Sequence, residues 1–129
     1  MGRNVLSQVA AHAHDTLPAE CCGVLIGRAD EVVEAIRAAN LSDDPNRYAM
    51  DPKAHIDARR AARARGLDVV GFYHSHPHSA PEPSARDRDE FTYPGHLYAI
   101  VSLRVEPAEV GLFRFDAGNF QRVSFVTVG

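Results

Sequence analysis

The stretch DVVGFYHSH, residues 68–76, decides the fold because it predicts a buried central strand. β-branched and aromatic side chains dominate it, and such side chains favour strands. Pro77 follows directly and ends the strand, because proline cannot donate a backbone hydrogen bond to a sheet. The sequence therefore predicts one central strand of a larger sheet at this position.

The flanking sequence predicts two larger helices and one short one. Residues 4–16 have apolar residues at helical spacing, and Pro18 ends that segment. Asp51 and Pro52 form the N-cap and the first position of a second helix, which Gly66 ends. Residues 84–91 predict the short helix.

Further strands are predicted on both sides of the central one. Two pair around a polar turn, two lie near the C-terminus joined by the turn DAGN, and a short one precedes the second helix. In chain order the predicted strands are 21–27, 31–39, 47–50, 96–103, 109–115 and 120–128. The fold class that follows is α/β or α+β, with a mixed sheet flanked by the helices.

Length and composition fit one domain spanning residues 1–129, because 45% hydrophobic residues suffice for a core. No apolar run approaches the roughly 18–20 residues of a membrane span. The N-terminus also lacks the features of a signal peptide. The interspersed charges, with a net charge of −3, predict no nucleic-acid partner. The one basic run, residues 59–65, is interpreted as the solvated face of a helix.

The two cysteines, Cys21 and Cys22, are adjacent in the sequence. Neighbouring side chains on a strand point to opposite faces, so a structural disulfide between them is not expected. Reduced thiols and no export signal predict a cytoplasmic protein.

Candidate metal ligands are concentrated in HSHPHSAPEPSARD, residues 74–87. His74 and His76 are two apart on a strand, so both imidazoles leave the same face. Asp87, early in the short helix, is a candidate third ligand. Three ligands that leave a fourth position to water are typical of a catalytic zinc site, whereas four protein ligands make a structural one.

Two alternatives stay open on spacing alone. The histidine pair could be His76 and His78 rather than His74 and His76, although Pro77 should turn the chain away from strand alternation. Ser84 and Asp87 also match a helix N-cap followed three residues later by an acidic residue, which needs no metal.

Residues 74–87 resemble the signature of the JAMM, or MPN-plus, metalloprotease family, H-x-H-x(7)-S-x(2)-D, without a gap. Upstream, PAECCGVLIG at 18–27 is similar to the family's first strand, and Glu20 stands at the position of its glutamate. The resemblance implies a cytidine-deaminase-like JAMM/MPN fold with a largely antiparallel mixed sheet. It also implies Zn²⁺ held by His74, His76 and Asp87. Glu20 would be the general base and Ser84 a hydrogen-bond donor to the oxyanion.

The same resemblance implies an activity. Members of the family cleave amide bonds, commonly after the C-terminal Gly-Gly of ubiquitin or ubiquitin-like proteins. The short connections at 39–51 and 88–96 are similar to the compact prokaryotic members, which act on sulfur-carrier proteins of ubiquitin-like fold. The expected function is therefore a zinc isopeptidase or peptidase acting on such a carrier. The alternatives are a zinc amidase acting on small peptides and a non-catalytic MPN-type binding module. The oligomeric state, and whether Cys22 or His78 touches the site, stay open.

Overall fold

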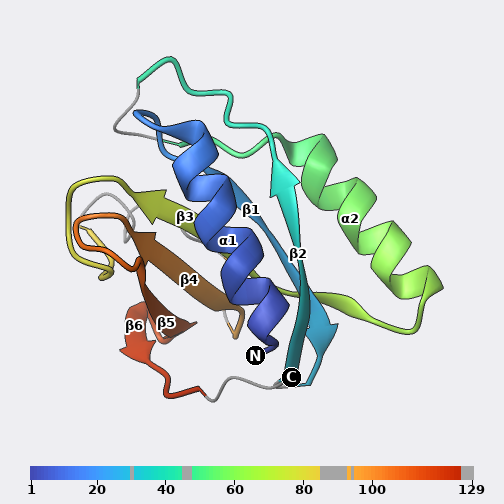
Figure 1. Cartoon of the computed structure of the whole chain (residues 1–129). Helices are drawn as coiled ribbons and strands as arrows, with labels where there is room; N and C mark the ends of the chain where they lie inside the picture. The colour runs from blue at the N-terminus through green and yellow to red at the C-terminus, as the bar shows by residue number, and fades with distance from the viewer. Residues whose placement is uncertain (30, 45–47, 85–92, 94, 126–129) are drawn as a thin grey trace.

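The structure is a computed structural model that describes residues 1–29, 31–44, 48–84, 93 and 95–125. Within these residues the chain forms helices and strands in the order α1 (Arg3–Thr16), β1 (Cys22–Arg28), β2 (Glu31–Ala38), α2 (Pro52–Ala64), β3 (Asp68–His76), β4 (Leu97–Ser102), β5 (Glu109–Asp116) and β6 (Asn119–Arg122) (Figure 1). Both larger helices and the central strand predicted from the sequence are confirmed.

The six strands form one sheet in the order β2-β1-β3-β4-β5-β6. β3 and β4 pair in parallel, and every other pair of neighbours is antiparallel. The predicted fold class, a mixed and largely antiparallel sheet with flanking helices, is confirmed. Nearly all of the short helix predicted at 84–91 lies outside the described residues.

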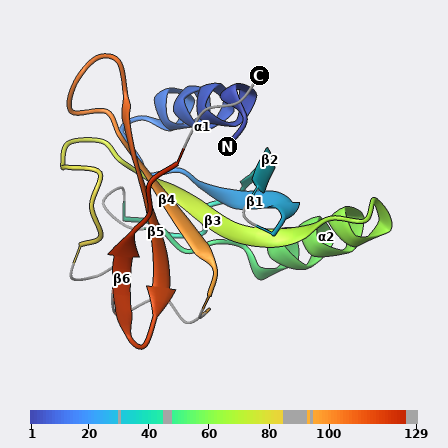
Figure 2. The ribbon, with the colours of Figure 1, turned by 90° about the horizontal axis from the view of Figure 1, so that it is seen from below.

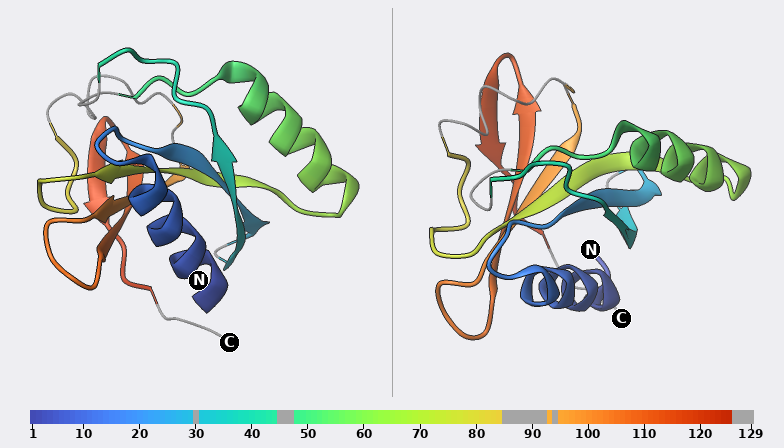
Figure 3. Two further views of the ribbon diagram at one scale, coloured as in Figure 1. Left: turned by 45° about the horizontal axis from the view of Figure 1, so that its top comes forward. Right: turned by 90° about the horizontal axis from the view of Figure 1, so that it is seen from above.

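The two helices cover opposite faces of the sheet, as Figure 2 and the right panel of Figure 3 show. β3 and β4 are buried along most of their length, and their apolar residues run without alternation through 69–73 and 97–101. Alternate residues of β3 therefore serve two separate cores. Tyr73 belongs to the core beneath α1, and Phe72 belongs to the core beneath α2.

On the α1 face, Tyr73 fixes how the helix meets the sheet. Its hydroxyl lies 2.7 Å from Nδ1 of His12 on α1. Its ring also lies over Gly23, the residue opposite it on β1, where a Cβ would come within 2.2 Å of the ring carbons. Glycine at position 23 therefore gives the buried tyrosine the room to reach α1.

On the α2 face, both ends of the helix follow the predicted capping pattern. The Asp51 carboxylate accepts a hydrogen bond from the Lys53 backbone N–H at 3.0 Å, with Pro52 at the first helical position. Gly66 follows the last turn with φ +76°, a left-handed conformation that favours glycine. Ala58 and Ala62 are the buried residues of α2, and their small side chains let the helix lie close to the sheet.

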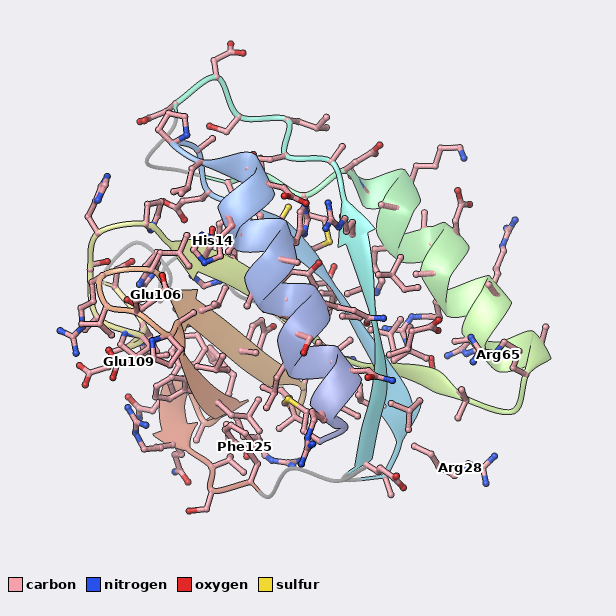
Figure 4. All side chains as sticks on the ribbon, in the orientation of Figure 1. His14, Arg28, Arg65, Glu106, Glu109 and Phe125 are labelled. Carbon is pink, nitrogen blue, oxygen red and sulfur yellow. The ribbon has the colours of Figure 1, made fainter. Side chains whose placement is uncertain are left out.

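The C-terminal hairpin has the predicted turn. Ala117 and Gly118 both have positive φ, as a two-residue turn between antiparallel strands requires. β6 ends at Arg122, so residues 123–125 of the strand predicted at 120–128 lie outside the sheet, and 126–128 lie outside the described residues. Phe125, labelled in Figure 4, is partly buried against the core beneath α1.

The short strand predicted at 47–50 is not formed by its described residues. Met50 makes only an isolated bridge with Asn40. The arginines of the basic run lie mostly in solvent, as predicted. Arg65 pairs with Glu34 at 2.7 Å, and Arg63 lies 3.3 Å from Asp68. Over the part of the chain that is described, no helix has the length and apolar character needed to cross a membrane.

Candidate metal centre

His74 and His76 project from the end of β3 on the α2 face of the sheet. Their side chains are 1% and 6% exposed, and their Nε2 atoms lie 3.2 Å apart. Two nitrogens bound to one tetrahedral zinc at about 2.0–2.1 Å each would lie about 3.3 Å apart. The spacing of the two imidazoles therefore fits a shared metal ion.

The orientation of the His76 ring is set by the turn that follows β3. Nδ1 of His76 lies 2.8 Å from the carbonyl oxygen of Ala80. A carbonyl only accepts hydrogen bonds, so Nδ1 carries the proton, and Nε2 of the neutral ring keeps its lone pair. Histidine ligands of metals are commonly held in this way by a backbone carbonyl.

Glu20 completes the group from the residue pair just before β1. Its carboxylate and the two imidazoles place their ligand atoms within 4.8 Å of one another, and Glu20 is 8% exposed. Among the described residues, Glu20, His74 and His76 form the group of side chains that could hold a metal ion. A cation held by the two imidazoles would also lie within reach of this buried carboxylate and would balance its charge.

The backbone around Glu20 is held by the central strand. Oγ of Ser75 accepts a hydrogen bond from the Cys21 N–H at 2.8 Å, and the Ser75 N–H donates to the Cys21 carbonyl at 3.1 Å. Ser75 stands between the two histidines but points to the opposite face. It thus ties Glu20 to the strand that carries both imidazoles.

The other predicted candidates are placed differently. Ser84 is exposed, and Asp87 lies outside the described residues. His78 is exposed and is not part of the group within 4.8 Å. Cys22 lies opposite His74 across the β1–β3 pair, but its Sγ points toward the Ala39 carbonyl at 3.7 Å.

Both cysteines are free and buried. Burial raises the pKa of Cys22 to about 12, with added effects of Cys21 and Glu20. Burial likewise raises the pKa of Cys21 to about 11. Both side chains are therefore protonated thiols at neutral pH and act as small apolar groups.

Three residues near the group had not been predicted. Ser75 could have been noticed as a polar residue inside an apolar strand. Asn40 donates from Nδ2 to the Glu20 carbonyl at 2.9 Å, and the ring of Tyr48 stacks on His74 with centroids 4.6 Å apart. No spacing in the sequence relates Asn40 or Tyr48 to the two histidines.

An aromatic cluster continues the row of β3 side chains beyond His74. The ring of Phe72 contacts His55 at 5.0 Å and His96 at 5.7 Å, and Tyr93 contacts all three rings. His55 and His96 are far apart in the sequence, and the structure brings both rings against Phe72. Burial lowers the pKa of His55, and the Arg59 guanidinium and His96 lower it further.

The chain is similar to known proteins in sequence and in fold. A desampylase from Haloferax volcanii is 41% identical over 102 residues, which cover 77% of this chain and 73% of that protein. A probable TtuB-protein conjugate cleaving protease from Thermus thermophilus is 36% identical over 89 residues, covering 68% of this chain and 60% of that protein. The crystal structure of a JAB1/MPN domain protein from Archaeoglobus fulgidus has the same fold, with a TM-score of 0.66, 22% identity, and coverage of 99% of this chain and 97% of that one.

The family described as prokaryotic homologs of the JAB domain, Prok-JAB, matches residues 2–116. The resemblance that residues 74–87 and Glu20 indicated is thereby confirmed. Because the match covers nearly the whole chain, the protein belongs to the prokaryotic homologs of the JAB domain, a compact form of the JAMM/MPN fold, and is a hydrolase of the protease class.

Proposed function

We propose that this chain is a zinc-dependent peptidase that hydrolyses the amide bond after the C-terminal Gly-Gly of a ubiquitin-like or sulfur-carrier protein. The observation that carries the proposal is the buried carboxylate of Glu20 beside two converging imidazoles. The named activities of the relatives, a desampylase and a protease of TtuB-protein conjugates, support a conjugate of this kind as substrate.

The residues fit zinc as the metal. His74 and His76 supply neutral nitrogen ligands, and Asp87 is proposed as the carboxylate that completes a three-residue set. When bound, zinc supplies Lewis acidity that lowers the pKa of water toward neutrality and polarises a carbonyl. Three protein ligands are typical of catalytic rather than structural zinc sites.

Glu20 is proposed as the general base and then the general acid. Its carboxylate takes a proton from the water that attacks the carbonyl carbon, and it returns that proton to the leaving amine as the C–N bond breaks. Its burial keeps bulk water away from the transferred proton.

Ser84 is proposed as the donor to the oxyanion that develops on the substrate carbonyl. Removing one such donor typically raises the barrier by about 3 kcal/mol.

An extended Gly-Gly tail suits a narrow approach to these groups, because glycine lets the substrate backbone come close. Both cysteines are free, which supports the cytoplasm as the proposed compartment.

The experiment compares two substrates that share one tail. The zinc-loaded protein is incubated with a Gly-Gly-ended carrier bearing one extra amino acid, and separately with a free peptide of the same tail. We expect kcat/KM to be at least about tenfold higher for the carrier, because the folded body adds binding outside the cleft. Equal rates would favour a peptidase of small peptides, and no cleavage of any carrier conjugate would contradict the proposal.

Glu20→Gln tests the proposed role of Glu20 as the base. The amide keeps the shape of the side chain but cannot take the proton, so turnover should fall by about 10²–10⁴-fold while zinc content is retained. Zinc is measured by elemental analysis in the same sample. A zinc-loaded Glu20→Gln protein with full activity would remove Glu20 from the mechanism.

A further inference from the structure

The connection between β2 and α2 is closed at its base by backbone hydrogen bonds. The Leu41 N–H donates to the Ala49 carbonyl at 2.8 Å, and the Asp51 N–H donates to the Ala39 carbonyl at 3.1 Å. Asn40 forms a bridge with Met50 at the same place. The two ends of the connection, at residues 39–41 and 49–51, are therefore held side by side, and we call this place the neck.

Asn40 lies in this neck, and among the described residues its side chain forms hydrogen bonds with Glu20, Ser42 and Ala49. Oδ1 accepts from the N–H of Ala49 at 2.9 Å and from the N–H of Ser42 at 3.0 Å. Nδ2 donates to the Glu20 carbonyl at 2.9 Å. The partners fix which end of the amide is which, because two of them are N–H donors and the third is a carbonyl.

The two ends of the amide reach two members of the metal centre. Nδ2 holds the backbone of Glu20, whose carboxylate lies beside the histidines. Oδ1 holds Ala49, and the preceding residue is Tyr48, whose ring stacks on His74 with an interplanar angle of 20°. One half-buried side chain thus connects the proposed base with the ring that covers a proposed ligand.

We propose that Asn40 is a positioning residue for the metal centre. Its Nδ2 fixes the backbone from which the Glu20 carboxylate projects, and its Oδ1 fixes the neck that keeps Tyr48 on His74. The inference rests on the proposed function for its effect on turnover. The effect of Asn40 on the positions of Glu20 and Tyr48 does not depend on the substrate, because both contacts of Asn40 exist in the free protein.

Two substitutions separate the two ends of the amide. Asn40→Asp keeps an oxygen for the N–H groups of Ser42 and Ala49 but cannot donate to the Glu20 carbonyl. Asn40→Ala removes all three hydrogen bonds. Ser42→Ala is the matched control, because its hydroxyl bonds only within the same connection, to the N–H and carbonyl of Asp44 among the described residues.

The first readout is the NMR shift of the His74 ring protons in the zinc-loaded protein. A ring stacked at 4.6 Å moves these protons upfield. We expect Asn40→Ala to lose that upfield shift, and Asn40→Asp and Ser42→Ala to keep it. A His74 shift that is unchanged in Asn40→Ala would overturn the proposal, whatever the protein cleaves.

The second readout is turnover with bound zinc measured in each sample. Misplacing a catalytic group by about 1 Å can reduce the rate by about 100-fold, and we expect Asn40→Asp to lose kcat on that order with KM within about threefold of wild type. Asn40→Ala should lose kcat and also raise KM. Unchanged kcat in Asn40→Asp, loss of its zinc, or an equal loss in Ser42→Ala would overturn the proposal. If the wild type cleaves no conjugate while the His74 shifts behave as expected, the proposed function fails and the positioning role stands.

Discussion

His74 and His76 face the same point, but different groups hold their rings. His76 is oriented by the Ala80 carbonyl through Nδ1, and His74 is covered by the ring of Tyr48. The Ala80 carbonyl fixes which nitrogen of His76 carries the proton, and the Tyr48 ring fixes the plane of the His74 ring. The two Nε2 atoms lie 3.2 Å apart in the group that includes the Glu20 carboxylate, a geometry that fits a bound cation.

The ligand set can be tested by metal analysis. We expect His74→Ala, His76→Ala and Asp87→Asn each to lower zinc affinity by more than about 100-fold, because each removes or neutralises a ligand. His78→Ala is the control and should keep one zinc per chain, since His78 is exposed and outside the group. If His78→Ala loses the metal while His76→Ala keeps it, the ligand assignment is wrong. An Asp87→Asn protein that keeps full affinity would assign Asp87 to helix capping instead.

Part of this centre could be predicted from the sequence for a local reason. His74 and His76 share a face because strands alternate with period two, and that rule needs no distant contact. Glu20 lies more than fifty positions away, so only the resemblance to a family placed it beside the histidines. Asn40 and Tyr48 reach the centre through pairings between β1, β2 and β3, which no local pattern encodes.

His12 makes stability depend on pH. Burial lowers its pKa, the Arg37 guanidinium lowers it further, and Asp15 opposes this with a smaller effect. Burial also raises the pKa of Tyr73, so its hydroxyl stays protonated beside the His12 ring, with which it shares a hydrogen bond. Because the folded pKa lies below the unfolded one, the unfolded chain takes up more protons as the pH falls. Stability present above about pH 6.5 is therefore lost progressively below it.

We expect the free energy of unfolding, measured in urea between pH 7.5 and 5, to fall with a contribution from His12 of at most about 1.4 kcal/mol per pH unit. His12→Gln keeps a group that can accept from Tyr73 but does not titrate, so its curve should be flatter than that of wild type. His14→Gln, at an exposed position of the same helix, should follow the wild type. Identical slopes for wild type and His12→Gln would contradict this role.

Among the elements, α2 could be predicted well because the residues at its two ends mark where the helix begins and ends. Asp51, Pro52 and Gly66 act within one turn of the helix ends, so their effect can be recognised without knowing the fold. The short strand predicted at 47–50 failed for the opposite reason. A strand needs a partner along its length, and among its described residues only Met50 finds one.

The cap of α2 gives a prediction for stability. Asp51→Ala removes the hydrogen bond to the Lys53 N–H and should lower the free energy of unfolding by about 1 kcal/mol, or Tm by about 3–5 °C. Asp57→Ala is the control, because it removes only the exposed ion pair with Lys53 and should change stability by less than about 0.5 kcal/mol. Both values come from thermal unfolding of the zinc-loaded protein. Equal losses in the two variants would mean that the cap does not contribute.

At the scale of the whole molecule, the sequence predicts most of the segments that form the sheet but not the order in which they pair. Each strand has its own pattern of apolar residues, whereas the order β2-β1-β3-β4-β5-β6 depends on pairings between distant segments. β1 lies between β2 and β3, and this brings the start of β1 next to the end of β3. Glu20 and the two histidines meet at that junction. The order of the strands therefore creates the site from parts that are separate in the sequence.

The parallel pairing of β3 with β4 has a consequence for how the chain can vary. The 20 residues between His76 and Leu97 must return along the paired strands from His76 to the level of Gly71, a span of about 17 Å at roughly 3.3 Å per residue. Fully extended, they would reach about 66 Å. This crossover therefore has about four times the length that it needs. The register between β3 and β4, which places the ends of these two strands side by side at His76 and Ser102, therefore does not by itself fix the length of the crossover.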